Sequence, residues 1–453
     1  MDLNSIIRGF LGILFLVGIS FLLSNNKKRI NWKLVISGLT LQFVFAVFIL
    51  RSEEIRNFFA PLGWPKDFFN WISGFFVIIL GFTTEGAEFV FGNLAKVPGS
   101  EGSLGSFFAF QVLPTIIFFA SLMGVLYYVG FMQKIVKAMA WVMAKFMGTS
   151  GAESLSCSAN IFVGQTEAPL MIKPYLKDMT RSEILTIMVG GMATIAGGVM
   201  AAYIQILGSA YAAKTGVPLV EAQQLFATQL LGASVMAAPA AIVISKIMIP
   251  EVEEPKTMGT VKIKVEKGAS NLIEAAANGA GDGLKLALNV GAMLLAFIAF
   301  IALINYGLHF VGDFFDWNRA LIDKIGEPLS FQLILGWMFQ FIAFGIGVPW
   351  QDALNFGSLF GTKIVVNEFV AYTDLGTLIE TGKLLNEKTI LMATYALCGF
   401  ANFSSIAIQI GGLGPLAPNK KSQIASLGIK AVIGGALATL MTATLAGLLY
   451  YSN

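Results

Sequence analysis

Apolar residues in this chain of 453 residues gather in continuous runs of about 20, separated by short polar segments. A run of this length lets an α-helix cross the hydrocarbon core of a bilayer, whereas spanning strands would alternate apolar and polar residues. We therefore predict an all-α polytopic membrane protein with about eight transmembrane helices. The expected spans cover residues 6–23, 32–50, 107–130, 184–207, 225–249, 286–308, 390–410 and 427–450.

Two further segments are too short to cross the membrane twice. Around residues 150–176, fewer than 30 residues separate the basic residues Lys145 and Lys173, and basic residues stay on the cytoplasmic side. Two crossings would need about 40 residues, so we predict a re-entrant hairpin that turns back within the membrane. Residues 350–375 predict a second hairpin, entered from the opposite side. Irregular backbone at this depth requires protein or a water-filled cavity around it.

The two halves of the chain repeat one order of elements. "AWVMAKFMG" precedes the first hairpin and "GWMFQFIAFGIG" the second, and two more spans follow each hairpin. Gly-rich amphipathic pieces, "GFTTEGAEFVFG" and "NGAGDGLKLALN", lie earlier in each half. Because three crossings separate the copies, the second begins on the opposite face, as in the inverted repeats of many secondary transporters.

This repeat predicts the domain organisation. We expect N-terminal scaffold helices in residues 1–65, a first repeat in 66–249, a cytoplasmic loop in 250–268 and a second repeat in 269–453. Within the loop, "VKIKVEKG" alternates like a small strand. Basic clusters fall on one side of the spans, which places both termini outside a cell inner membrane.

Composition agrees with a membrane protein and excludes several functions. Hydrophobic residues make up 56% of the chain and charged residues 13%, about half the charged share of a soluble protein. A net charge of +3 without a basic-aromatic patch argues against nucleic acid as a partner. His309 is the only histidine, so neither a histidine metal site nor a Ser-His-Asp triad is expected, and we predict no enzyme activity.

Polar residues cluster at four matching places. An acid at the bilayer centre costs about 2.5–3.5 kcal/mol, so such residues indicate function. The alternatives are hairpin ends that reach solvent, hydroxyls bonded to the preceding turn, and amides that join helices. Two clusters lie in the hairpins, Asn160 with Gln165-Thr166-Glu167 and Asn367-Glu368. The other two, "ATIAGGV" at 193–199 and "CGFANFSS" at 398–405, interrupt the spans that follow the hairpins, so we predict broken helices there.

These stretches resemble the concentrative nucleoside transporter family of sodium-coupled nucleoside symporters. The motifs "GQTEAP", "NEFVAY" and "FANFSS" occur in that order, and the likeness covers nearly the whole chain. It implies sodium-coupled uptake of nucleosides by an elevator-like alternating-access mechanism. It also implies a homotrimer with the third and sixth spans near its centre. Sodium would be the coupling ion, and no other cofactor is implied. The sequence does not decide between pyrimidine and purine nucleosides, which uridine and adenosine represent.

The resemblance further implies roles for individual residues. The nucleobase would be bound by Gln165, Thr166, Glu167 and Val199, and the ribose by Glu368, Asn402, Ser405 and Phe400. Sodium would be bound by Asn160, Val163, Thr194 and Ile195, where Thr194 replaces the serine expected in relatives. The chemistry fits, because a carboxylate and an amide can hold ribose hydroxyls by charge-assisted bonds, and Gln and Thr suit a base edge.

Two other functions remain open from the residues alone. One is proton coupling, with Glu167 or Glu368 carrying the proton. The other is an elevator-type transporter of a different small polar solute, such as a dicarboxylate or amino acid. An anionic substrate usually calls for a buried arginine, and no arginine lies in the four clusters.

Overall fold

The computed structural model describes residues 3–51, 55–57, 64–97, 100–105, 107–258, 269–384 and 386–450. Within these ranges the regular elements are helices, and the β-type pairing is limited to an isolated antiparallel bridge between Ser150 and Met258. The expected strand-like "VKIKVEKG" lies outside the described residues. The first helices are α1 (Leu3–Leu22), α2 (Trp32–Leu50), α4 (Trp64–Phe91), α5 (Phe108–Gln111), α6 (Leu113–Val129) and α7 (Phe131–Met147).

Eight helical stretches of the described chain are long and apolar enough to cross a membrane, and seven of the expected spans are among them. The expected span at 390–410 is formed by two shorter helices, α18 (Glu387–Leu397) and α19 (Phe403–Leu416), on either side of the expected interruption, so it is not among the eight continuous stretches. The eighth stretch is instead 67–94, largely α4, which was not expected as a span because its second half was interpreted as a Gly-rich amphipathic piece. The acids of α4 lie near its two ends, Asp67 in the first turn and Glu85 and Glu88 toward the last, so an apolar middle remains.

The first hairpin consists of α8 (Gly151–Ala159), a turn, the 3-10 helix η4 (Ala168–Ile172) and α9 (Lys173–Leu176). The second consists of α16 (Trp350–Val365) and α17 (Glu368–Glu380). Asn367 begins α17 by accepting a hydrogen bond on its side-chain oxygen from the Val370 backbone N–H at 2.9 Å. Both expected hairpins are therefore formed, and polar side chains lie where their helices end and restart.

The helix after each hairpin is broken, as expected. In the first repeat α10 (Arg181–Ala193) ends before α11 (Gly197–Thr215), and in the second α18 ends before α19. The two breaks touch each other: a Cβ on Gly399 would lie 2.7 Å from the Met192 carbonyl oxygen. Only glycine permits this approach of backbone to backbone.

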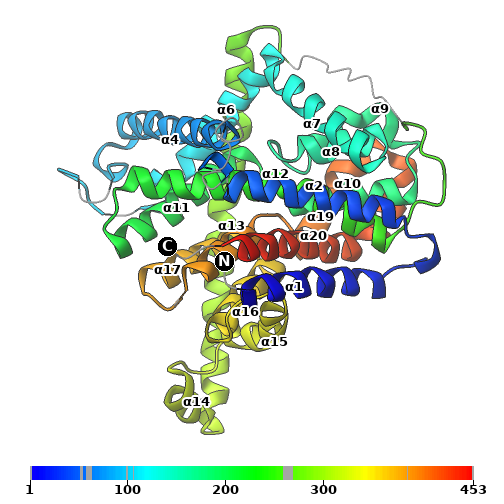
Figure 1. Ribbon diagram of the computed structural model, residues 1–453. Helices are drawn as coiled ribbons and strands as arrows, with labels where there is room; N and C mark the ends of the chain where they lie inside the picture. Colours follow the sequence, from blue (N-terminus) through cyan, green and yellow to red (C-terminus); the bar gives the residue numbers. More distant parts are fainter. Residues whose placement is uncertain are drawn as a thin grey trace.

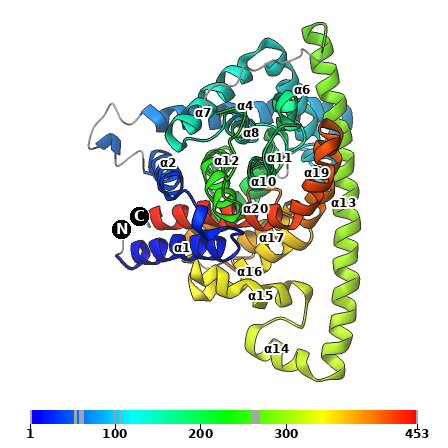
Figure 2. The ribbon, with the colours of Figure 1, turned by 90° about the vertical axis from the view of Figure 1, so that its right-hand side faces the viewer.

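The breaks lie in the interior of the molecule. They pack against α12 (Leu219–Met248) and α20 (Lys421–Leu449), whose apolar stretches are almost wholly buried. In Figure 2 these helices occupy the middle, while α13 (Leu272–Phe314) stands along one edge and α15 (Phe331–Gly345) lies near α16. Figure 1 shows the same arrangement from the side, with α14 (Trp317–Ile325) at one extremity. The fold thus encloses its irregular backbone in protein, as membrane depth requires.

Buried carboxylates hold the base of each hairpin to the next helix. In the first repeat, Glu183 in the first turn of α10 accepts a hydrogen bond from the Ser150 hydroxyl at 2.6 Å. In the second, Asp352 of α16 accepts from the Thr389 hydroxyl at 2.6 Å and from the Asn386 backbone N–H at 3.1 Å. Charge-assisted bonds of this kind are stronger than neutral ones. Each hairpin is therefore anchored to the helix that carries the following break.

Candidate functional site

Glu368, the first residue of α17, is the buried acid of the predicted site, with 5% of its surface exposed. Its carboxylate accepts hydrogen bonds from the Tyr203 hydroxyl at 3.2 Å and from the Asn402 side-chain amide at 2.9 Å. Asn402 in turn begins α19, because its side-chain oxygen accepts from the Ser405 backbone N–H at 2.9 Å. The second hairpin and the second helix break therefore share one polar cluster.

A chain of hydrogen bonds extends this cluster to the first hairpin. The Gln165 side-chain amide donates to the Ser405 hydroxyl at 3.2 Å, and the Gln165 oxygen accepts from Gln409 at 3.0 Å. Gln409 also donates to the Met188 carbonyl of α10 at 2.9 Å. Through Gln165, Ser405 and Asn402 the first hairpin is thus connected to Glu368, although these residues lie up to 240 positions apart.

The other residues predicted to bind the nucleoside differ in how far they are buried. Val199 is buried near the start of α11, Phe400 and Thr166 are half-buried, and Thr166 lies against Gly412 of α19. Glu167 is exposed, and its carboxylate lies against Gly164. A buried acid was expected in both hairpins; in this chain the Glu368 side chain is buried, whereas Glu167 is exposed.

The residues predicted to bind sodium lie where the first hairpin meets the first break. Asn160 ends α8, is 1% exposed, and neither its side-chain nitrogen nor its oxygen has a hydrogen-bond partner among the described residues. The Thr194 hydroxyl is buried and donates to the Gly190 carbonyl at 2.9 Å, which leaves its oxygen lone pairs available. An unpaired buried polar group costs about 1–3 kcal/mol, so Asn160 lacks a partner that a ligand could supply.

Backbone contacts hold this region together. The Gly197 N–H at the start of α11 donates to the Phe162 carbonyl in the hairpin turn at 3.1 Å. Ile195 is fully buried within the break and Val163 is half-buried in the turn. Amide, hydroxyl and carbonyl oxygens gathered at unwound helix ends are the ligands that transporters use for sodium.

Three buried polar residues at the site were not predicted from the sequence. Tyr203 stacks on Tyr372 with ring centroids 4.2 Å apart, and Gln409 bonds Gln165. Each follows a predicted residue by four positions, Val199 and Ser405, and residues four apart share a helix face. Lys363 lies within the second hairpin, and an ionisable residue at membrane depth by itself indicates a functional role.

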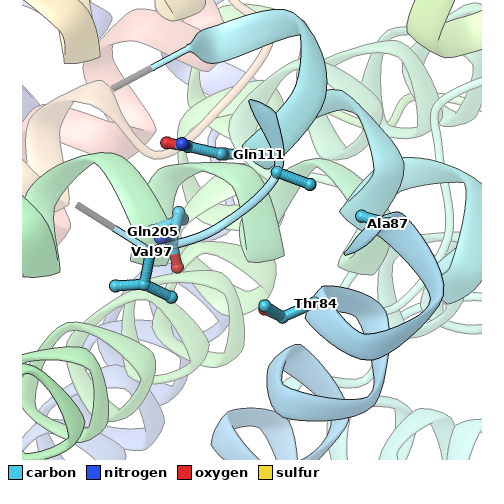
Figure 3. A pocket seen from close by; sticks show the side chains of 6 residues that line it. Thr84, Ala87, Val97, Gln111 and Gln205 are labelled. Atoms are coloured by element: carbon cyan, nitrogen blue, oxygen red, sulfur yellow. The ribbon is translucent and has the colours of Figure 1, made fainter. Parts of the chain in front are cut away.

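A small hollow of about 10 Å³, roughly the room that one water molecule needs, lies elsewhere, between α4, α5 and α11. Figure 3 shows Thr84 and Ala87 of α4, Gln111 of α5 and Gln205 of α11 at its wall. The Gln111 amide is engaged, because it donates to three backbone carbonyls including that of Leu94. The lining includes none of the predicted site residues.

Three family models match the chain: the Na+ dependent nucleoside transporter N-terminus at residues 11–94, nucleoside recognition at 109–210, and the Na+ dependent nucleoside transporter C-terminus at 229–447. An uncharacterized transporter of Haemophilus influenzae is 44% identical over 447 residues, which cover 98% of both chains. Sodium/nucleoside cotransporter 1 of Homo sapiens is 40% identical over 97% of this chain and 63% of its own length.

Solved structures agree in fold. CNTnw in an inward-facing substrate-bound state is 40% identical, with a TM-score of 0.83 over 98% of both chains. A substituted CNTnw in an outward-facing state is 39% identical, with a TM-score of 0.82 over 98% of this chain and 97% of that one.

Proposed function

The chain belongs to the family of Na+-dependent nucleoside transporters, and on this premise we propose that nucleoside and sodium bind where the two hairpin tips meet the two helix breaks. The protein is a multi-pass plasma-membrane transporter, not an enzyme, and it takes up nucleosides by sodium-coupled alternating access.

The hydrogen-bonded chain from Gln165 through Ser405 and Asn402 to Glu368 carries the proposal. It joins the tips of both hairpins and the second break into one polar surface inside an apolar protein. Inverted-repeat transporters place their substrate at such a repeat interface, near the bilayer midplane. A single small polar molecule could therefore contact both repeats at once.

Glu368, Asn402 and Ser405 form the ribose side, with Phe400 beside them. A carboxylate has about four lone-pair sites, of which Tyr203 and Asn402 use two, so ribose hydroxyls can donate to the others. These bonds would be charge-assisted and stronger than those of a neutral acceptor. The Tyr203 and Asn402 contacts fix the carboxylate in advance, so little side-chain freedom is lost when the ribose binds.

Gln165, Thr166 and Glu167 form the nucleobase side, and Val199 contributes an apolar contact. The Gln165 amide is held by Gln409 and Ser405, which favours one orientation of its donor and acceptor. Glu167, exposed at the hairpin turn, would reach the base edge from the open side. We propose that both pyrimidine and purine nucleosides, represented by uridine and adenosine, fit this side.

Sodium binds at Asn160, with the carbonyls of Val163 and Ile195 and the hydroxyl of Thr194. The unpaired amide of Asn160 supports this assignment, because its oxygen needs a positive partner. Asn160 and Gln165 lie on the same hairpin turn, so a bound ion would order the turn that contacts the base. Sodium would thereby raise nucleoside affinity, and linkage makes the effect reciprocal.

The two hairpins and two broken helices form an elevator-like mobile unit that moves against a scaffold including residues 1–65. The first repeat covers residues 66–249 and the second 269–453, with a cytoplasmic loop in 250–268 between them. The parallel order of hairpin, broken helix and long helix in both repeats supports these boundaries. We place both termini outside the cell. In support, Gly9 near the start of α1 packs against Leu448 near the end of α20, so these ends lie on one side.

A homotrimer would place α6 and α13 near its centre. The two helices pack closely, since a Cβ on Gly279 would lie 2.6 Å from the Ala120 carbonyl oxygen. The outer face of α13 is apolar and uncovered: Leu288, Leu295 and Leu303 are 62%, 76% and 65% exposed. Such a face suits either lipid or partner subunits, and in the proposed trimer part of it would be covered by partner subunits.

Uptake into vesicles tests the assignment. Wild-type vesicles with an inward sodium gradient should accumulate labelled uridine or adenosine, and replacing sodium by choline should stop uptake. Asn160→Ala should raise the half-saturating sodium concentration about tenfold or more, because one oxygen contact to the ion is lost. Ile36→Ala, on an exposed apolar face of α2, is the control and should leave sodium activation unchanged.

An unchanged sodium activation curve for Asn160→Ala would remove this residue from the ion site. Uptake that ignores sodium but collapses with the proton gradient would favour a proton-coupled mechanism instead.

A further inference from the structure

Lys363 is a fully buried lysine in α16, two residues before that helix ends at the tip of the second hairpin. Its ammonium group donates to the Ala396 carbonyl at 2.8 Å and to the Thr439 hydroxyl at 3.0 Å. Within the described part of the chain, no carboxylate forms an ion pair with it at 4.0 Å or less. Burying a charge without an ionic partner is costly, so this lysine calls for an explanation.

The location of Lys363 corresponds to the proposed sodium site. In the first repeat, that site lies between the end of hairpin helix α8, at Asn160, and the end of α10, at Thr194. The equivalent helices of the second repeat are α16 and α18. Lys363 lies in the last turn of α16, and its acceptor Ala396 lies in the last turn of α18. The ammonium therefore occupies the same junction between hairpin and helix break.

The chemistry of the two positions also corresponds. An ammonium and a sodium ion each carry one positive charge, and both bind carbonyl and hydroxyl oxygens. The last carbonyls of a helix carry partial negative charge and are stabilised by a nearby cation. At the end of α10 a sodium ion from solution would supply that charge, whereas at the end of α18 the covalently attached ammonium supplies it.

We propose that Lys363 is a tethered cation that fills, in the second repeat, the place of a second sodium ion. Sodium coupling then runs through the first repeat alone, and no second sodium ion is needed at the second break. This inference rests on the proposed sodium site at Asn160. It gives Lys363 a positioning role, because the residue neutralises and orders the second break rather than contacting the nucleoside.

The test is Lys363→Gln. Glutamine keeps N–H donors for Ala396 and Thr439, removes the charge, and offers an amide oxygen like that of Asn160. Without the ammonium, the second break should need a sodium ion of its own. The apparent reaction order of nucleoside uptake in sodium concentration should therefore rise by about one. At a sodium concentration tenfold below half-saturation, uptake relative to its own maximum should then be about tenfold lower than in wild type.

Two companion variants separate charge from shape. Lys363→Arg keeps the positive charge and should retain the wild-type sodium order, even if its maximal rate changes. Lys285→Gln removes a lysine whose side chain is 79% exposed on α13 and should leave sodium activation unchanged. Sodium activation curves of Lys363→Gln and wild type that superimpose after scaling to maximal rate would overturn the proposal.

Poor recovery of Lys363→Gln would not prevent a decision. Its melting temperature in detergent should then rise more steeply with sodium chloride than that of wild type, while choline chloride has no such effect. Equal responses of the two proteins would overturn the proposal. Sodium activation curves of wild type and Asn160→Ala, measured in the same experiment, test the proposed sodium site of the first repeat separately. A wrong assignment of that site can therefore be told apart from a wrong role for Lys363.

Discussion

Glu368→Gln changes one atom of the proposed ribose site and preserves its shape. The Glu368 carboxylate accepts one hydrogen bond from Asn402 and one from Tyr203. In the variant, the remaining side-chain oxygen can still accept from Asn402. The new amide group can donate to the Tyr203 hydroxyl, which both donates and accepts. The Tyr203 O–H then loses its only acceptor in the described structure, which costs about 1–3 kcal/mol, so expression and melting temperature of the variant are measured beside its binding.

The expected loss is in nucleoside affinity. A hydrogen bond to a charged group contributes about 1.5–3 kcal/mol and one between neutral groups about 0.5–1.5 kcal/mol. Replacing the carboxylate therefore removes about 1–2 kcal/mol for each ribose hydroxyl that donates to it, which corresponds to an affinity about 5- to 30-fold lower. Uridine uptake well below saturation should fall at least in proportion.

The assay compares binding of uridine and 2′,3′-dideoxyuridine to purified wild type and variant. The dideoxy compound lacks both hydroxyls, so its affinity should be almost the same for the two proteins. Glu380→Gln, an exposed acid at the other end of α17, is the matched control and should behave as wild type. An equal loss for both nucleosides, or no loss for uridine, would refute the ribose assignment of Glu368.

Three other predictions concern recognition of the nucleobase, the contact between the two helix breaks, and the ion pair where the first hairpin begins. Thr166→Ala should change the ratio of uridine to adenosine uptake by about two- to tenfold, the loss of one neutral hydrogen bond, and competition between the nucleosides measures it; an unchanged ratio would exclude a base contact. Gly399→Ala should lower the melting temperature and slow transport, because its Cβ would lie 2.7 Å from the Met192 carbonyl oxygen; a wild-type melting temperature would show that the breaks can separate freely. Lys246→Met should destabilise the protein by about 3–5 kcal/mol, because it leaves Glu153 buried without its ion-pair partner at 2.8 Å. Adding Glu153→Gln should recover part of that loss in thermal unfolding, and no recovery would argue against the pair.

The predicted fold was correct where a short-range pattern decides the structure. Apolar run length located seven of the eight stretches, and segments too short for two crossings identified both hairpins, the first of them through its basic flanks. The break between α18 and α19 was also visible, because glycine and polar residues at 398–405 interrupt an apolar run. The missed span, α4, has the opposite pattern. In α4 the acids interrupted the pattern without interrupting the helix.

The candidate site was predictable only as a set of residue types. Polar residues at four interruptions were visible in sequence, but their mutual contacts join positions as distant as Gln165 and Gln409. Such contacts depend on how the repeats pack, which no local pattern encodes. The same packing left Glu167 at an exposed turn while Glu368 became buried, although both acids follow polar residues in hairpin segments.

The amino-acid sequence by itself determined that this chain crosses a membrane, re-enters it twice and interrupts two helices, because helix length, charge sidedness and polar residues in apolar runs are local properties. Only the tertiary structure decided that the interruptions touch, that Tyr203 and Asn402 hold Glu368, and that Lys363 meets the end of α18. The physical reason is that burial and hydrogen bonding across the repeats depend on which helices pack together, and a side chain's partner is chosen by that packing.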